Sequence, residues 1–266
     1  MQDKRNEILT ALNETKKLFP SLSDKRLIEN VERLLNEPGA RDVKPTSFFQ
    51  QPTLHFYHGL ESQPFLNKES LNLQGLIDSA DLVRAEFGLF MSKSRQKNGR
   101  FDVFRDGSGK VPEYLSGPLN VVDVISPSDT PGKAADSKLS EEFFPHTRAA
   151  LMKCVGFANS AFFSLMHPGT HLKPHYSESN VRYTVHLGVQ IPNGDCFLRV
   201  AEEKRKWNVG KTLAFDGSYL HEAWNFSDHL RVILIANFWH PDLNDAEKYF
   251  IETFDSRINR SDVHNW

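Results

Sequence analysis

Four histidines lie close together in the stretch HPGTHLKPHYSESNVRYTVHLG, residues 167–188. Imidazole nitrogens bind first-row divalent metals, and a carboxylate from aspartate or glutamate often completes such sites. The stretch ends in alternating apolar and polar residues, which is the pattern of a β-strand. It therefore offers candidate metal ligands on or beside a strand, and leaves open which histidines bind and which residue completes the site.

His186 lies between Val185 and Leu187, so its side chain points to the opposite face of the predicted strand. If Val185 and Leu187 pack in an outer layer, Arg182, Thr184 and His186 share the other face. Burying these polar side chains for packing alone would be costly, so their face suits a polar ligand. The alternative is a single hydrogen-bonded core histidine.

Two later residues can complete a site with His175. His175 follows Pro174 in the loop before the strand, and His221 begins the segment HEAWNFS. In a jelly roll these positions can meet at the mouth, where two imidazoles can bind a first-row divalent metal. Arg231 lies in LRVILIANFW, where a buried arginine would clamp a carboxylate by a two-pronged hydrogen bond. A surface arginine on an edge strand remains the alternative.

His171 and His175 are four residues apart, a spacing that can place two ligands on one helix face. Two prolines and a glycine in this stretch oppose a helix. We therefore expect His167 and His171 to make structural hydrogen bonds in a turn.

Short runs with strand character dominate the chain from about residue 157, and turn residues separate them. Asn193-Gly194 is a typical hairpin dipeptide. Seven or so such strands predict a sandwich or a barrel-like jelly roll over about 157–243. The fold class expected is α+β with a mainly β core, supporting helices and a short N-terminal helix pair.

Helices are expected at several places around this core. Apolar residues at helical spacing predict two short amphipathic helices within 5–37, a longer one at 69–92, one near 140 and one from 244. The N-terminal pair lacks a basic face, so packing or partner contact is favoured over DNA reading.

Two further segments read as irregular. Residues 45–68 are aromatic and interrupted by proline, so they should lie against the core as irregular edge structure. Residues 93–137 are polar and rich in glycine and proline, which predicts a lid, a binding loop or a disordered segment.

Composition narrows the class of protein. The formal charge is −2, and acidic and basic residues are interspersed, so the sequence shows no basic patch of the kind that binds nucleic acid. No signal peptide and no apolar run of about 18 residues is present, so we expect a cytoplasmic protein without a membrane span. Cys154 and Cys196 should be buried thiols rather than a disulfide.

Four blocks of the sequence resemble the aspartyl/asparaginyl β-hydroxylase family of Fe(II)- and 2-oxoglutarate-dependent oxygenases. They are SLMHPGTHLKPH, NVRYTVHLGVQIP, WNVGKTLAFDGSYLHEAWN and LRVILIANFWHPDL, in the family's order and spacing. The resemblance covers about residues 141–243. It implies a double-stranded β-helix. We expect residues 41–266 to form the oxygenase domain, and residues 1–40, which show no resemblance to the family, to form a helical appendage.

The same resemblance implies the roles of the site residues. His175 and His221 would bind the iron, while Ser164, His186 and Arg231 would form the 2-oxoglutarate pocket. Where most 2-oxoglutarate oxygenases supply a carboxylate two residues after the first histidine, this chain has Ser177.

Three explanations for Ser177 remain open. The aspartyl β-hydroxylase subgroup itself lacks the carboxylate and tolerates a two-histidine site. Alternatively, the gap admits chloride, as in iron halogenases, or the site is inactive. Glu178, the next residue, is a further candidate ligand.

One departure from the family concerns the substrate. Peptide-hydroxylating members carry a second arginine where this chain has Thr184, and Arg182 on the same face is its expected partial substitute in the cosubstrate pocket. Trp224 and the 93–137 segment are expected to form a wall and lid over the substrate.

The function expected is hydroxylation of an unactivated C–H bond with Fe(II), 2-oxoglutarate and O2. The favoured position is the β-carbon of an aspartyl or asparaginyl unit in a peptide, free amino acid or natural-product precursor. The alternatives are an iron halogenase, a lipid acyl hydroxylase, or a non-catalytic protein that binds a small anion. Nothing in the sequence indicates the oligomeric state.

Overall fold

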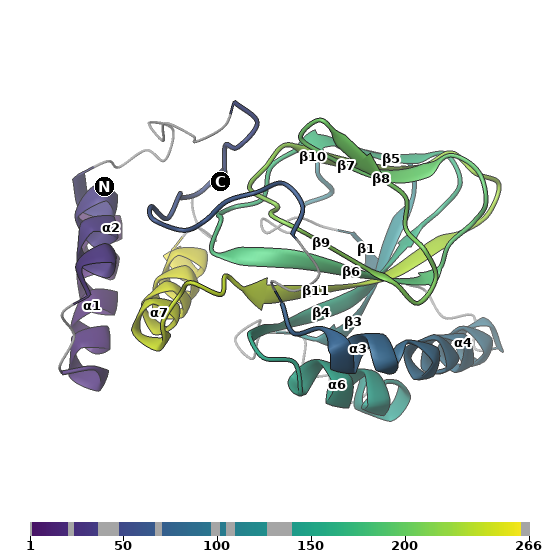
Figure 1. The fold of residues 1–266 in the computed structure, drawn as a ribbon, viewed down its shortest axis with the longest axis horizontal. Coiled ribbons are helices and arrows are strands. Elements are labelled where there is room, and N and C mark those ends of the chain that lie inside the picture. The colour runs from purple at the N-terminus through teal and green to yellow at the C-terminus, as the bar shows by residue number, and fades with distance from the viewer. Residues whose placement is uncertain are drawn as a thin grey trace.

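The protein folds as two facing β-sheets with helices against one sheet and at one end, as the computed structural model shows (Figure 1). The described residues are 2–20, 24–36, 48–66, 71–96, 102–104, 110–126 and 140–261. Neighbouring strands in both sheets run antiparallel.

The larger sheet has six strands. In spatial order they are β1 (Asp102–Val103), β3 (Leu119–Ile125), β4 (Phe157–Met166), β11 (Arg231–Trp239), β6 (Arg182–Gln190) and β9 (Thr212–Phe215). The smaller sheet has five. They are β2 (Leu115–Ser116), β5 (Thr170–His175), β10 (His221–Asn225), β7 (Cys196–Val200) and β8 (Glu203–Arg205).

The path of the chain identifies the fold. From β4 to β11 it alternates between the larger and the smaller sheet, except that the hairpin of β7 and β8 stays in the smaller one. This winding of two sheets by one chain is a double-stranded β-helix. The predicted fold class is therefore confirmed.

Alternation along the strands separates two cores. Phe163, Val185 and Leu187 pack toward α3 (Gln74–Asp78), α4 (Ala80–Gln96) and α6 (Pro145–Met152), which cover the outer face of the larger sheet (Figure 1). Met166 and Ile233 instead pack between the sheets. Because side chains alternate along a strand, residues such as Ser164 and His186 point between the sheets.

The structure corrects the expectation of a loop over residues 93–137. The described part of this range contains β1, β2 and β3, and β3 lies within the larger sheet beside β4. The sequence of β3, LNVVDVI, is mostly apolar and favours a strand, although the segments on either side of it are polar and rich in glycine. Residues 97–101, 105–109 and 127–137 lie outside the described residues, so the lid remains a prediction.

Other expectations are met. Residues 48–66 contain no regular helix or strand. They form isolated bridges to the barrel at Gln50 and Phe65 and further backbone hydrogen bonds, such as that from Leu66 N to the carbonyl of Ala214. Both cysteines are buried free thiols. No helix in the described part of the chain is long and apolar enough to cross a membrane.

The N-terminal helix pair packs against the C-terminal helix. Helix α1 (Gln2–Leu18) and α2 (Lys25–Asn36) share a hydrophobic core with α7 (Asp245–Ser261). Ile8, Leu27 and Phe250 are each at most 1% exposed in this core. Packing is thus the structural role of the pair, as its sequence favoured.

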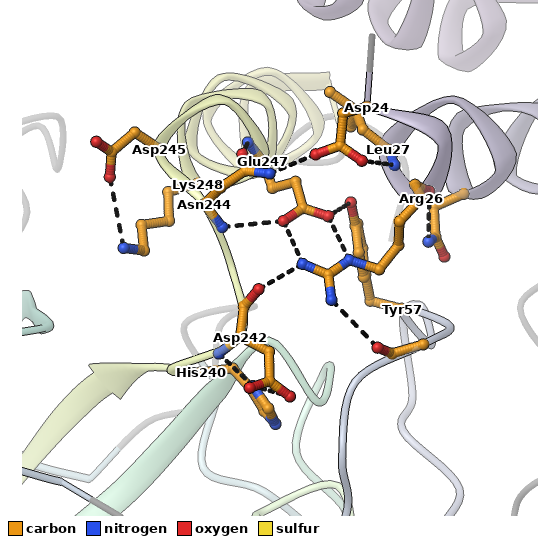
Figure 2. A network of polar contacts seen from close by, with 12 residues as sticks. Asp24, Arg26, Leu27, Tyr57, His240, Asp242, Asn244, Asp245, Glu247 and Lys248 are labelled. Carbon is orange, nitrogen blue, oxygen red and sulfur yellow. Dashed lines mark hydrogen bonds and ion pairs between the residues drawn. The ribbon is translucent and has the colours of Figure 1, made fainter. Parts of the chain in front are cut away.

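A buried carboxylate joins this helix pair to the barrel (Figure 2). Glu247 in the first turn of α7 has no exposed side-chain surface and accepts hydrogen bonds from Arg26 Nε and Nη2 and from the Tyr57 hydroxyl, at 2.6–2.8 Å. Glu247 Oε2 also accepts from Asn244 N, while Asn244 Oδ1 accepts from Glu247 N. This reciprocal pair is a capping box, so one side chain both starts α7 and anchors α2.

A second carboxylate fastens α6 to α4. Glu86 accepts hydrogen bonds from the backbone N–H groups of His146 (2.7 Å) and Thr147 (2.9 Å) and from the Thr147 hydroxyl (2.7 Å). The N-cap residue of α6, Phe144, has no side-chain group that can cap the helix. Glu86 of α4 instead accepts hydrogen bonds from the first backbone N–H groups of α6. Burial alone would raise the pKa of Glu86, but these hydrogen bonds lower it below its ordinary value.

Glu86→Gln should lower the free energy of unfolding by about 1–3 kcal/mol at pH 7, because an amide cannot accept all of these bonds. The pKa of Glu86 is lower in the folded state than in the unfolded state, where it is about 4.3. The stability that the Glu86 carboxylate contributes is therefore fully present above the unfolded-state pKa, and it is lost as the pH falls through the folded-state pKa. Urea denaturation of both proteins at several pH values between 7 and 3 measures the difference, which should shrink toward acid pH.

Glu142→Gln is the matched control, since Glu142 is exposed just before α6. It should change stability by less than about 0.5 kcal/mol. An equal loss in the two variants, or a loss from Glu86→Gln that does not change with pH, would contradict the capping role.

Candidate metal and carboxylate site

Two histidines face each other across neighbouring strands of the smaller sheet, where one strand ends and the other begins. His175 is the last residue of β5 and His221 the first of β10, and the antiparallel register pairs them directly. Their ring centroids are 4.2 Å apart with the planes inclined at 52°. The structure thus brings together the two residues that the sequence offered as metal ligands.

Both imidazoles are held by the same kind of hydrogen bond. His175 Nδ1 lies 2.7 Å from the carbonyl oxygen of Lys173, and His221 Nδ1 lies 2.8 Å from that of Tyr219. A carbonyl oxygen can only accept, so Nδ1 carries the proton in each ring. Each Nε2 then keeps its lone pair, which is the arrangement that protein metal sites use to orient histidine ligands.

The surroundings also keep these rings neutral. Burial and the neighbouring His175 lower the pKa of His221 to about 3. Burial likewise lowers the pKa of His175. Neutral imidazole is the metal-binding form, so the pair does not need to lose a proton to bind a cation at neutral pH.

No carboxylate of the described residues completes the pair. Ser177 packs against Gly217: a Cβ built on Gly217 would lie 2.4 Å from Ser177 Oγ and 3.6 Å from Thr184 Oγ1. Glu178 is exposed, although its backbone carbonyl accepts bonds from residues 54 and 55. Among the described residues, no three histidine, cysteine, aspartate or glutamate side chains gather as a metal site. Within the described residues, the candidate metal ligands of the protein are therefore the two imidazoles.

A buried arginine lies between the sheets, and none of the interactions recorded among the described residues pairs it with a carboxylate. Arg231 is 2% exposed, and its Nη1 lies 3.3 Å from Ser164 Oγ and 3.4 Å from the Ser164 carbonyl. Its Nη2 lies 3.2 Å from Met166 Sδ, and its guanidinium carbon lies 5.0 Å from the Trp207 ring centroid. Its Nε has no hydrogen-bond partner. Because a buried charge is costly unless it is paired, this guanidinium is suited to a carboxylate ligand.

His186 connects the two halves of the site. The Trp207 indole N–H donates to His186 Nδ1 at 3.1 Å, so the proton of the neutral ring lies on Nε2. Burial first, and then the charges of Arg231 and His221, hold the pKa of His186 well below its usual range. Phe215 contacts the rings of both His186 and His221. A neutral N–H donor thus lies between the arginine and the histidine pair.

Arg182 does not join this group. Its Nη1 pairs with Asp255 of α7 at 2.9 Å, and its guanidinium stacks over Trp239 at 4.2 Å. Thr184, two residues further along the same strand, lies beside Gly217: its Oγ1 would be 3.6 Å from a Cβ built there. Arg182, Thr184 and His186 do share one face of β6, as the sequence predicted. Arg182, however, lies at the end of the strand that is next to α7, away from the site.

Trp224 is also placed elsewhere. In β10 the buried residues are His221, Ala223 and Asn225, so Trp224 points to the outer face of the smaller sheet. There it contacts Phe197, and its indole N–H donates to Asp195. The expectation that Trp224 forms a wall of the substrate site is therefore wrong.

The two remaining histidines of the opening stretch make side-chain contacts, as predicted, but His171 does so from strand β5 and not from a turn. His167 Nε2 lies 2.9 Å from Asn120 Oδ1, and His171 Nε2 lies 2.7 Å from Glu222 Oε2. Glu222 also accepts from Arg199. Sequence patterns gave no signal for Trp207, Met166 and Phe215, because single apolar residues in short segments resemble ordinary core residues.

The pattern of donors suits two groups at once. Two neutral imidazoles whose Nε2 atoms keep their lone pairs suit a first-row divalent metal. A buried guanidinium with an unpaired N–H, next to a serine hydroxyl and a histidine N–H, suits a small carboxylate ligand. A keto acid with two carboxylates is therefore chemically compatible with the whole group.

Part of the chain is similar to known hydroxylases. Residues 132–241 match the family model described as aspartyl/asparaginyl beta-hydroxylase. Mouse aspartyl/asparaginyl beta-hydroxylase is 44% identical over 86 residues, which cover 32% of this chain and 12% of that protein. The ornithine lipid ester-linked acyl 2-hydroxylase of Rhizobium tropici is 40% identical over 99 residues, covering 36% of this chain and 35% of that protein.

The matched segments span about a third or less of these relatives' own lengths. Among solved structures, a prolyl-4-hydroxylase from Pseudomonas putida aligns with 63% of this chain and 98% of its own, at 17% identity and a TM-score of 0.39. The family match includes every strand from β4 to β11. Over residues 132–241 the chain is therefore similar to the aspartyl/asparaginyl β-hydroxylase family.

Proposed function

We propose that this protein is an Fe(II)- and 2-oxoglutarate-dependent hydroxylase that acts on an unactivated C–H bond. The observation that carries the proposal is the combination of two neutral, oriented imidazoles with a buried arginine that has no carboxylate partner among the described residues. Neither half of the site is explained by packing alone.

The residues present fit the iron and the cosubstrate. His175 and His221 would bind Fe(II) through Nε2, because each Nδ1 is already engaged. Arg231 and Ser164 would hold the distal carboxylate of 2-oxoglutarate, and His186 Nε2–H would donate to the carboxylate nearer the metal. When bound, iron and 2-oxoglutarate supply the oxidising power for hydroxylation by O2, with succinate and carbon dioxide as coproducts.

The chain's own contribution is orientation and exclusion of water. The carbonyls of Lys173 and Tyr219 fix the two imidazoles, and Phe215 and Trp207 cover the inner part of the site. Low dielectric surroundings strengthen the attraction between Arg231 and a bound carboxylate. Holding the reacting groups in one orientation lowers the entropic part of the barrier.

The favoured substrate is an aspartyl or asparaginyl unit hydroxylated at its β-carbon, in a peptide, free amino acid or natural-product precursor. The family match and the mouse relative support this choice. A lipid acyl chain is the second candidate. It is favoured by the similarity to the Rhizobium acyl hydroxylase and by Thr184, since a threonine offers no positive charge for an acidic side chain.

His175→Ala and His221→Ala should each abolish tight metal binding, because one imidazole with waters is a weak site. Anaerobic calorimetry with Fe(II) or Mn(II) measures the loss. His171→Ala is the matched control: His171 lies on the same strand as His175 but bonds Glu222, so its loss should leave metal affinity within about threefold. Wild-type affinity in either His175→Ala or His221→Ala would remove the metal assignment.

Arg231→Met should separate cosubstrate binding from folding. Replacing a buried, incompletely paired cation with an apolar side chain of similar length should leave the ligand-free protein as stable as before or stabilise it by about 1–4 kcal/mol. The same change should remove the rise in melting temperature that 2-oxoglutarate causes, while Mn(II) binding persists. A variant that is less stable yet still responds to 2-oxoglutarate would show that the arginine is structural.

Turnover identifies the reaction class. The wild-type protein with Fe(II), ascorbate and 2-oxoglutarate should form succinate, slowly without substrate and faster with the correct one. Candidates to screen are aspartyl peptides, free and carrier-bound amino acids and acyl lipids, with mass detection of an added oxygen atom and chloride present to reveal chlorination. Cosubstrate binding without any succinate would instead indicate a non-catalytic protein that binds a small anion.

A further inference from the structure

A tyrosine ring lies flat on the more exposed of the two histidines. The Tyr114 and His175 ring centroids are 4.3 Å apart and the planes are inclined by only 4°. His221 also contacts His175, at 4.2 Å and a steep angle. His175 therefore contacts an aromatic ring that stacks on its plane, in addition to the second histidine.

The two histidines differ in how firmly the barrel holds them. His221 is 9% exposed and begins a strand that is paired on both sides, with Phe215 against its ring. His175 is half-buried and is the last residue of β5, after which the chain runs without a strand until Arg182. A hydrogen bond from Nδ1 alone leaves an imidazole free to tilt about that bond. His175 thus has the greater need of a second restraint.

The backbone fixes Tyr114 to this histidine. The carbonyl oxygen of Tyr114 accepts from Lys173 N at 2.8 Å, and the carbonyl oxygen of Lys173 accepts from His175 Nδ1 at 2.7 Å. The next residue, Leu115, pairs with Leu172 as β2 joins the edge of β5. The stack and the Nδ1 bond are therefore tied to one short piece of backbone, and they restrain two different rotations of the same imidazole.

We infer that Tyr114 is a positioning residue for His175. Its ring keeps the imidazole plane fixed so that Nε2 stays aimed at the bound metal, and it shields that face of the ligand from water. The inference rests on the proposed function, in which His175 binds the iron. It assigns a role in the site to the segment around residues 110–116, which precedes the β-helix in the chain.

The test compares Tyr114→Phe, which keeps the stacked ring, with Tyr114→Leu and Tyr114→Gln, which remove it. Metal affinity is measured by anaerobic calorimetry with Mn(II), and site geometry by the absorption bands of the Co(II)-loaded protein at saturation. Tyr114→Phe should bind within about twofold of wild type with unchanged bands. The other two should bind about tenfold or more weakly, with altered bands, as expected when a group that orients a ligand is lost.

Melting temperatures of the metal-free variants check folding, and a half-exposed tyrosine beside a short edge strand should be replaceable in at least one of the two ways. Wild-type affinity and bands in Tyr114→Leu and Tyr114→Gln would overturn the inference. An equal defect in Tyr114→Phe would overturn it too, because the hydroxyl rather than the stack would then matter.

The His175→Ala variant separates this outcome from a failure of the proposed function. If His175→Ala loses metal while the Tyr114 variants do not, only the positioning role is wrong. If His175→Ala binds metal as wild type does, the metal assignment and the inference fall together.

Discussion

The antiparallel pairing of β5 with β10 is the constraint on which the site depends. Its register places His175 opposite His221, and a shift of one residue would turn one of them to the outer face of the sheet. The pairing is secured on its other side by β7, which pairs with all of β10. Because β5 and β10 are distant in sequence, the two ligands meet only when the whole double-stranded β-helix has closed.

The charges of the site suit a ligand that carries two negative charges. The described residues offer it two neutral imidazoles, a neutral His186 and one guanidinium, and no carboxylate. Together with the guanidinium, a divalent metal would make three positive charges, and a dicarboxylate would offset two of them. With an aspartate in place of Ser177, the metal half of the site would carry one positive charge less. With Ser177 at this position, the positive charge of a bound metal would therefore be neutralised more by the proposed cosubstrate than by side chains of the protein.

The local sequence pattern was enough to predict the orientation of some site residues. It failed for residues whose position depends on contacts with elements that are distant in the sequence. Alternation along β6 placed Val185 and Leu187 outward and His186 inward, because a strand's period of two is a local property. The fate of Arg182 depended on Asp255 in a helix some seventy residues later. The role of Trp207 could not be predicted for the same reason, because its partners His186 and Arg231 lie on two strands elsewhere in the sequence. Strand β3 was obscured by the polar residues on either side of it.

The junction around Glu247 has a consequence for how this protein can be divided. Arg26 neutralises a carboxylate that has no exposed side-chain surface, and it does so from a helix outside the β-helix (Figure 2). A chain that began after residue 40 would retain Glu247 and Tyr57 but leave that charge buried without its cation. It would also uncover the apolar face of α7 that Ile8 and Leu27 now cover. The N-terminal helices are thus part of what allows the last helix to fold against the barrel, and a shortened protein without activity would say little about catalysis.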